Sequence, residues 1–352
     1  MSKKIRVLLA DDSAMARGLL RSYLEDEEDF EVVGEARHGE EAVAMAIELT
    51  PDLITMDLEM PRMGGLEAIE EIMCLRAAPI LVVSSVADAH NAYAAVAHGA
   101  LDVVAKPSTD AHERREFISK ARLVAGVKVI THVRSRYRGE AASGVPAAPK
   151  FPVPETLPER FRESEPVVVI AASTGGPQAL AEILPMLPAD FPAPILVAQH
   201  ISAGFAAGMA EWLATLSPLP VRLGKNGDAL EPGVVTVAPS EYHMVLTAER
   251  RIWLRERTEG DLYRPSCDLL LQSVADTCGR HSLGVILTGM GRDGSQGIQA
   301  IHAAGGLTLA QDEGSSVIFG MNAHAIASGA VDEVVTLEQI AASMVRLLGE
   351  LA

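Results

Sequence analysis

The sequence is short of basic residues. It has 30 Lys and Arg against 47 Asp and Glu, a formal net charge of −17 at pH 7 over 352 residues. A protein that binds nucleic acid or an anionic lipid surface needs an excess of positive charge on the binding face. We therefore expect no nucleic acid and no lipid surface among its partners.

Long apolar runs and paired cysteines are also missing. No apolar stretch approaches the ~20 residues of a membrane helix, and the run after the basic amino terminus, about five residues, is too short for a signal peptide. The three cysteines, Cys74, Cys267 and Cys278, are odd in number and lack zinc-site spacing. We expect a cytoplasmic protein without membrane insertion, with reduced and buried thiols.

The composition predicts two domains. With 352 residues and 48% hydrophobic content, the chain can bury two cores of ordinary size. Between residues 126 and 164, prolines, small residues and charges collect without an apolar period, which is typical of a linker. We predict domains over residues 1–125 and 165–352, with a linker over 126–164. Helical spacing from Phe117 is expected to run into the start of that linker.

Strand and helix patterns alternate through residues 1–125. Five short apolar runs, among them IRVLLA, EVVGEA and ILVVSS, are separated by helical patterns. This alternation predicts an α/β fold, a (βα)5 unit with a parallel sheet covered on both faces.

Polar side chains follow the strands of this predicted sheet. Asp11 and Asp12 follow the first strand, and Asp57 follows the third. Since the carboxyl ends of parallel strands lie together, these carboxylates converge, and we expect a cation, Mg²⁺, to offset their repulsion. Ser84 and Lys106, at the ends of the fourth and fifth strands, add a hydroxyl and an ammonium group. The set predicts a site for a phosphoryl group on a carboxylate oxygen.

Three apolar runs of the second domain lead to residues of hydrolytic chemistry. VVVIAAS ends at Ser173, LVAQH ends at His200, and VILTGMGRDG carries Asp293. Strand ends carry the reactive groups of open α/β sheets, so we expect these three side chains at one edge of a doubly wound, hydrolase-like domain. They are the parts of a serine hydrolase. The order Ser, His, Asp and the lack of a G-x-S-x-G elbow exclude the α/β-hydrolase superfamily.

Two further residues enter this hypothesis. Thr174 opens a glycine-rich turn into a helical pattern, so its backbone N–H is a predicted donor to the oxyanion of a tetrahedral intermediate. His243 lies just before another strand pattern and is the competing candidate for the general base. Spacing alone does not exclude it.

Residues 1–125 resemble the receiver domain of two-component response regulators across essentially the whole segment. The resemblance implies that Asp57 is the phosphoacceptor. It also implies that Asp12 and Asp57 bind Mg²⁺ directly, while Asp11 helps through a water molecule. Ser84 would be the switch hydroxyl, and Lys106 would contact the phosphoryl oxygens.

The segment from about residue 166 to the end is similar to the catalytic domain of the chemotaxis protein-glutamate methylesterases. The motifs ASTGGP, AQH, APSEYHM, YRPSCD, LTGMGRDG and VIFGM occur in the order and approximate spacing of that family. The resemblance implies that Ser173 is the nucleophile, His200 its base and Asp293 the partner of the base. It adds the Met290 amide as an oxyanion donor.

The same resemblance implies the reaction and its partners. Glutamate γ-methyl esters on the cytoplasmic helices of methyl-accepting receptors would be hydrolysed with release of methanol, and glutamines there deamidated. A chemotaxis histidine kinase would phosphorylate the receiver. Mg²⁺ would serve that phosphorylation, and ester hydrolysis would need no cofactor.

Several positions depart from these patterns. Receivers commonly have M-D-G where this chain has Gly64. The methylesterases have Met-Pro where this chain has Ile201 and Ser202, and proline where it has Asn322. We expect both lost prolines in loops beside the cleft, where they affect substrate fit more than catalysis. Histidine occurs in the family in place of Tyr263, for which we predict no chemical role.

Two other interpretations stay open. An adaptor with this fold would bind receptor helices without turnover. A nucleotide-binding domain would use residues 173–176 as a phosphate cradle, although the chain lacks both G-x-G-x-x-G and a Walker lysine. Labelling by a serine-directed phosphonate would separate the esterase from both.

Overall fold

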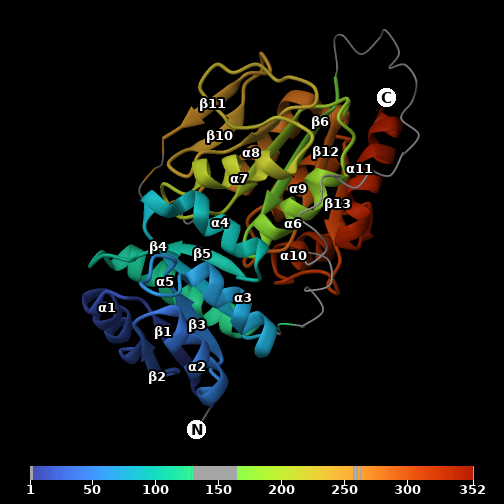
Figure 1. The fold of residues 1–352 in the computed structure, drawn as a ribbon. Coiled ribbons are helices and arrows are strands. Elements are labelled where there is room, and N and C mark those ends of the chain that lie inside the picture. The colour runs from blue at the N-terminus through green and yellow to red at the C-terminus, as the bar shows by residue number, and fades with distance from the viewer. Residues whose placement is uncertain are drawn as a thin grey trace. The chain divides into compact units, whose positions relative to one another are not determined.

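The chain divides into two compact units, Met1–Ser143 and Gly144–Ala352, each described here by itself (Figure 1). The computed structural model describes residues 3–127, 129, 165–256, 258, 261 and 263–351. Most of the predicted linker, over 126–164, lies outside these residues. In the described ranges, no helix combines the length and the apolar character needed to cross a bilayer.

The first unit is a five-stranded parallel sheet in the order β2-β1-β3-β4-β5. Its strands are β1 (Ile5–Ala10), β2 (Phe30–Ala36), β3 (Leu53–Met56), β4 (Ile80–Ser84) and β5 (Asp102–Ala105). Its helices are α1 (Ala14–Glu25), α2 (Gly39–Leu49), α3 (Gly65–Leu75), α4 (Ala89–Ala97) and α5 (Ala111–Ala125). Helix α1 contacts α5, whereas α3 contacts α2 and α4, so helices cover both faces. The predicted (βα)5 fold is confirmed.

The inner strands of this sheet are apolar because helices cover both faces. Every position of β3 and of β4 is buried, as expected for a parallel sheet. The backbone N–H of Asp57, just after β3, donates to the Ala10 carbonyl at the end of β1 (2.8 Å). Helix α1 starts beside this point, where the Ser13 hydroxyl accepts the N–H of Ala16 (3.3 Å). These bonds join the ends of β1 and β3 and the start of α1 where the acidic residues lie.

The prediction of buried thiols is wrong for one cysteine. Cys267 and Cys278 are buried, but Cys74 is exposed. Cys74 lies on α3, which turns Ile69 and Ile72 toward the core. The helical period places position 74 on the solvent side of that stripe.

The second unit contains a seven-stranded parallel sheet in the order β14-β13-β12-β6-β7-β9-β8. Its strands are β6 (Val167–Ala172), β7 (Ile195–Gln199), β8 (Val221–Leu223), β9 (Val235–Val237), β12 (Ser282–Ile286), β13 (Leu307–Gln311) and β14 (Glu333–Val335). Strands β10 (His243–Leu246) and β11 (Ile252–Arg255) form a separate antiparallel pair. The helices are α6 (Gly176–Ile183), α7 (Ala206–Leu216), α8 (Cys267–Cys278), α9 (Ser295–Ala303), α10 (Met321–Ala327) and α11 (Leu337–Leu351).

The strand order of this sheet reverses at β6, which lies between β12 and β7. The chain moves from β6 to β7 on one side and later returns to β12 on the other, which confirms a doubly wound domain. Helices α8 and α9 pack together on the sheet, and α6 packs against α7 and α11. In such sheets, ligands bind at the carboxyl ends of the strands beside the reversal. Ser173 directly follows β6 and lies at this point.

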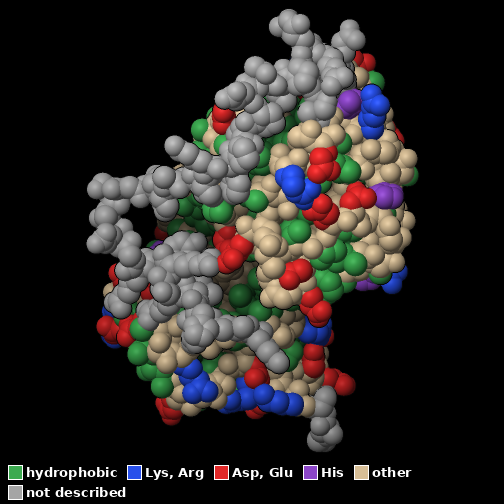
Figure 2. Space-filling model, turned by 90° about the vertical axis from the view of Figure 1, so that its right-hand side faces the viewer, with side chains coloured by type: hydrophobic (Ala, Val, Ile, Leu, Met, Phe, Trp, Pro, Cys, Tyr) green, Lys and Arg blue, Asp and Glu red, His purple; other side chains and the backbone are tan. Residues whose placement is uncertain are grey.

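Acidic side chains are dispersed on the face of the molecule that Figure 2 shows. Figure 2 shows one face of the molecule, on which acidic side chains lie at several separate places. The net charge of −17 is thus not the product of a single acidic patch on this face.

Candidate functional site

Ser173 occupies the turn between β6 and α6. Its backbone N–H donates to the Thr288 carbonyl (3.0 Å), and its own carbonyl accepts the Gly176 N–H (2.8 Å) and the Gln199 side-chain amide (2.7 Å). A Cβ at Gly289 would lie 2.6 Å from the Ser173 Cβ, so a side chain there would displace the serine. The backbone of Ser173 is thus fixed, and sequence analysis missed the residues that fix it. The polar residues Gln199 in LVAQH and Thr288 in LTGMG, each next to the end of an apolar run, carried the signal.

The turn after Ser173 leads directly into α6. Gly175 has φ +79°, in the left-handed region that favours glycine, and Pro177 lies in the first turn of the helix. None of the described residues accepts a hydrogen bond from the backbone N–H of Thr174 or of Met290. Both amides predicted as oxyanion donors therefore have no acceptor among these residues.

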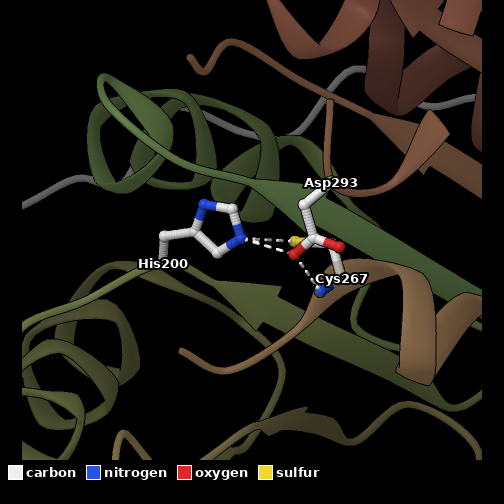
Figure 3. Close-up of side chains that lie close together, drawn as sticks. All are labelled: His200, Cys267 and Asp293. Atoms are coloured by element: carbon white, nitrogen blue, oxygen red, sulfur yellow. Dashed lines mark hydrogen bonds and ion pairs between the residues drawn. The ribbon is translucent and has the colours of Figure 1, made fainter. Parts of the chain in front are cut away.

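His200 directly follows β7 and forms a pair with Asp293. Its backbone N–H donates to the Ala172 carbonyl (3.0 Å), which ties it to the strand end that carries Ser173. Its Nε2 lies 2.7 Å from Oδ2 of Asp293 (Figure 3). The Nδ1 atom lies on the side of the ring turned away from Asp293 (Figure 3).

The predicted position of Asp293 at a strand end is wrong. Strand β12 ends at Ile286, and Asp293 lies in the following loop, directly before α9. The apolar run stops at Leu287, and the glycine-rich segment after it carries the chain back over the carboxyl edge of the sheet. The carboxylate therefore reaches His200 from a loop.

The start of α8 holds the Asp293 carboxylate. The N–H of Cys267 donates to Oδ2 (2.7 Å), while the N–H of Asp268 (2.9 Å) and the hydroxyl of Ser266 (3.1 Å) donate to Oδ1. The positive end of the helix dipole favours a negative charge at this place. Burial opposes the charged form, but the hydrogen bond with His200 and the helix amides hold the pKa of Asp293 below its usual value.

Asp268, at the start of α8, in turn accepts hydrogen bonds from the start of α9. Its Oδ1 accepts the N–H groups of Gly294 (2.8 Å) and Gly297 (2.7 Å) at the start of α9. Asp293 thus caps α8 while Asp268 caps α9, an arrangement named here the reciprocal cap. Burial, together with the charge of Asp293, raises the pKa of Asp268 to about 6. Sequence analysis missed Asp268 and Ser266, although a serine before an apolar helical pattern signals a helix cap.

Two side chains flank the imidazole of His200. The Tyr263 ring stacks on it, with centroids 4.9 Å apart and planes inclined by 12°. The N–H of Ile201 donates to the Arg264 carbonyl (3.1 Å), which ties the Tyr263 segment to the end of β7. The Cys267 Sγ lies 3.5 Å from Nε2, on the same side of the ring as Asp293 (Figure 3).

His243, the competing base, has both ring nitrogens engaged. It lies buried in β10, where its Nδ1 accepts the N–H of Ser266 (3.0 Å) and its Nε2 bonds to Asp261 (3.0 Å). The N–H of Thr258, and after it His243, lowers the pKa of Asp261 to about 2. His243 anchors the segment that leads to Ser266, and the geometry favours His200 as the base.

The positions that depart from the family pattern lie in different settings. Ile201 and Ser202 are buried in the loop after β7, as predicted. Asn322 lies in the first turn of α10, so its predicted place in a loop is wrong. Its side chain donates to the Gln311 carbonyl (3.0 Å) and to the Ser316 hydroxyl (2.7 Å). This amide ties the start of α10 to the end of β13.

The first unit brings its predicted acidic residues together. Carboxylate oxygens of Asp11, Asp12 and Asp57 lie within 4.8 Å of one another. The Lys106 ammonium lies 2.8 Å from Oδ2 of Asp57 and 2.9 Å from Oδ2 of Asp11. Burial raises the pKa of Asp57, against the opposing effect of Lys106. Burial lowers the pKa of Lys106, but its bonds to the two aspartates raise it overall.

The donor set of this cluster fits Mg²⁺. All three acidic side chains offer oxygen ligands, which hard divalent cations prefer, and Asp12 is exposed, so an ion can enter from solvent. The hydroxyl of Ser84, at the end of β4, is buried and has no hydrogen-bond partner among the described residues. A buried hydroxyl without a partner is costly, which favours a ligand oxygen that binds it.

The two units define the class of protein. The first is a receiver-type sheet with an acidic cluster, and the second is a doubly wound domain with serine, histidine and aspartate at its switch point. The family model "Response regulator receiver domain" matches residues 7–116, and the model "CheB methylesterase" matches residues 168–344. The chain belongs to the CheB methylesterase family.

Known relatives span nearly the whole chain. A protein-glutamate methylesterase/protein-glutamine glutaminase of Paramagnetospirillum magneticum is 55% identical over 98% of this chain and 97% of its own length. A protein of the same name from Pyrococcus horikoshii is 39% identical over 98% of this chain and 94% of its own length. The crystal structure of the CheB methylesterase catalytic domain of Thermotoga maritima, 36% identical, matches 52% of this chain and 99% of that one with a TM-score of 0.51.

Proposed function

We propose that this protein is a cytoplasmic enzyme that hydrolyses glutamate γ-methyl esters on methyl-accepting chemotaxis receptors and deamidates glutamines at such positions. The cytoplasmic helices of the receptors are its substrate, and phosphorylation of the receiver controls the activity. The observation that carries the proposal is the His200–Asp293 hydrogen bond of 2.7 Å beside the strand end that carries Ser173. The nearly full-length identity to enzymes of that name supports the substrate.

Ser173 is the nucleophile of the proposed first step. Its Oγ attacks the ester carbonyl carbon while His200 accepts the hydroxyl proton. The accepting atom is Nδ1, because Nε2 is engaged with Asp293. The oxyanion that forms accepts the N–H groups of Thr174 and Met290, and loss of one such donor typically costs about 10²- to 10³-fold in rate.

The intermediate then collapses with release of methanol. The bond from carbon to the methoxy oxygen breaks, and His200 returns its proton to that oxygen. Water attacks the acyl carbon on Ser173 while His200 accepts one of its protons. The bond from carbon to Oγ then breaks, His200 returns the proton to Oγ, and the free glutamate leaves. With a glutamine substrate, the same steps release ammonia.

The acidic cluster of the first unit accepts the phosphoryl group. Asp12 and Asp57 would hold Mg²⁺ directly and Asp11 through water, and the ion would offset the negative charge of the carboxylates and the incoming phosphate. A carboxylate oxygen of Asp57 bonds to the phosphorus while the bond from phosphorus to the histidine nitrogen of the kinase breaks, and the imidazole is the leaving group. Lys106 contacts the phosphoryl oxygens, and the buried Ser84 hydroxyl donates to one of them.

The receiver is proposed to inhibit the catalytic unit while it is unphosphorylated. A fragment over residues 165–352 is therefore expected to be more active than the whole chain. A tenfold difference needs only about 1.4 kcal/mol between the inhibited and the active forms. Acetyl phosphate should raise the activity of the whole chain and leave the fragment unchanged. The measurement is methanol release from methylated receptor fragments.

We expect the fragment to fold by itself, because the catalytic domain of a relative has been crystallised without a receiver. A fragment no faster than the unphosphorylated whole chain would exclude inhibition by the unphosphorylated receiver. The receiver would then act by stimulating the enzyme or by recruiting it to the receptor.

The stacked ring of Tyr263 offers a separate test of the base. Tyr263→Leu is expected to lower kcat/KM by about 2- to 10-fold, because stacking of this kind contributes roughly 0.5–1.5 kcal/mol. Tyr263→Phe keeps the ring and should retain nearly full activity in the same methanol assay. Equal losses in both variants would assign the effect to the hydroxyl group.

A further inference from the structure

Three donors of different chemistry meet beside His200. They are Nε2 of His200, Sγ of Cys267 and a carboxylate oxygen of Asp293, and all lie within 4.8 Å of one another. Figure 3 shows them facing one another, with Cys267 and Asp293 on the Nε2 side of the ring. The proposed mechanism uses the imidazole and the carboxylate but gives the thiol no role.

We propose that these three side chains form a binding site for a thiophilic divalent cation, best matched by Zn²⁺, and that the bound ion inhibits hydrolysis. The inhibition rests on the proposed function, whereas the binding of the ion does not. Cysteine, histidine and aspartate are the ligands of protein zinc sites, and three such ligands leave a fourth position for water.

The distances support a tetrahedral ion. Zn–S bonds of about 2.3 Å and Zn–N bonds of about 2.0 Å at tetrahedral angles place sulfur and nitrogen about 3.5 Å apart. The Cys267 Sγ lies 3.5 Å from the His200 Nε2 in the structure. The Asp293 oxygen, now 2.7 Å from Nε2, would move back by about half an ångström to the N···O separation of such a site. The ion would replace the hydrogen bond that this movement opens.

The charges also balance. A thiolate and a carboxylate together neutralise Zn²⁺, so the buried cluster carries no net charge with a neutral imidazole, and burial is far less costly than for a free ion. Burial raises the pKa of the Cys267 thiol well above its usual value, so the thiol keeps its proton until the ion displaces it. The oxygen ligands of the first unit prefer Mg²⁺, whereas sulfur and nitrogen favour Zn²⁺.

Binding of the ion removes the general base. A neutral imidazole coordinated through Nε2 carries its proton on Nδ1, the atom that must accept the proton of Ser173. The Cys267 and Asp293 side chains are buried, and 11% of the His200 side chain is exposed, so the ion enters past the imidazole. Inhibition should therefore develop over time and be reversed by a chelator.

The binding test uses Co²⁺ as a coloured substitute for Zn²⁺, added to the full-length protein with Mg²⁺ in excess. A thiolate-to-cobalt charge-transfer band is expected in the wild type and in Cys278→Val, a matched substitution of a buried cysteine. Cys74→Ser removes the exposed thiol and should keep the band, which would show that this thiol does not bind the cobalt ion. Cys267→Val should lose it. Absence of the band from the wild type, or its persistence in Cys267→Val, would overturn the site.

The inhibition test measures methanol release against Zn²⁺ concentration. Cys267→Val is expected to raise the concentration for half-inhibition by about 10- to 100-fold relative to wild type and Cys278→Val. Equal sensitivity of Cys267→Val and the wild type would overturn the inhibitory role. Failure of the proposed function is a distinct outcome, since the protein would then release no methanol even with a chelator, and the cobalt band is read without turnover.

Discussion

Ser173→Ala is expected to lower the rate of methanol release by about four to six orders of magnitude, because it removes the hydroxyl proposed as the nucleophile. His200→Ala should lose a similar factor, since an alcohol is a poor nucleophile without a base to accept its proton. Asp293→Asn should lose less, because it removes the charge but keeps an acceptor. The wild type, but not Ser173→Ala, should be labelled by a serine-directed phosphonate.

The controls for this prediction are available in the same unit. Ser343→Ala makes the same change at a buried serine of α11 and should leave the rate near that of the wild type. His243→Gln tests the competing histidine and should cost far less than His200→Ala. Near-normal hydrolysis by His200→Ala would return the role of base to His243. Absence of both labelling and turnover in the wild type would favour one of the other interpretations, an adaptor or a nucleotide-binding domain.

Asp57→Asn is expected to abolish incorporation of phosphate from a labelled phosphodonor. The neutral amide is a poor nucleophile, and it weakens the binding of the Mg²⁺ that the reaction requires. In the wild type, removal of Mg²⁺ by a chelator should stop the labelling as well. Because burial raises the pKa of Asp57, labelling should decline on the acid side at a higher pH than for a free aspartate.

A surface aspartate provides the matched control. Asp29 lies on the same unit, where it is paired with Arg122, and Asp29→Asn should be labelled like the wild type. Equal labelling of Asp57→Asn and the wild type would show that the phosphoacceptor is another residue. That result would leave the prediction for Ser173 intact, since the two sites belong to different units.

The residues at the carboxyl edges of the sheets could be predicted from the sequence, because a buried parallel strand is a continuous run of aliphatic residues. Strand β6 is a run of buried aliphatic residues, and the first polar side chain after it must stand at the carboxyl edge. The same logic places His200 after β7, and Asp11, Asp12 and Asp57 after β1 and β3. Each of these predictions needs only the local pattern and the rule that strand ends meet.

The surroundings of the site could not be predicted in the same way. The donors to Asp293 include two backbone N–H groups of α8. Every residue except proline has such a group, so the sequence does not show which of them donate to a side chain. The position of Asp293 was misassigned because the glycine-rich segment after Ile286 has no periodicity to fix its path. Which ring nitrogen of His200 bonds to Asp293 depends on a side-chain rotation that the sequence does not encode.

In the reciprocal cap, Asp293 has two roles: it is the proposed partner of His200, and it caps one of the helices that hold the site together. Asp293 accepts the first N–H groups of α8, and Asp268 accepts those of α9, so replacing either residue by one without an acceptor leaves a helix start unsatisfied. A mutation of Asp293 to a residue without an acceptor would cost both rate and stability, whereas such a mutation of Asp268 would cost stability at the start of α9. The two aspartates should therefore be inherited as one unit, even in descendants that have given up catalysis and kept the fold.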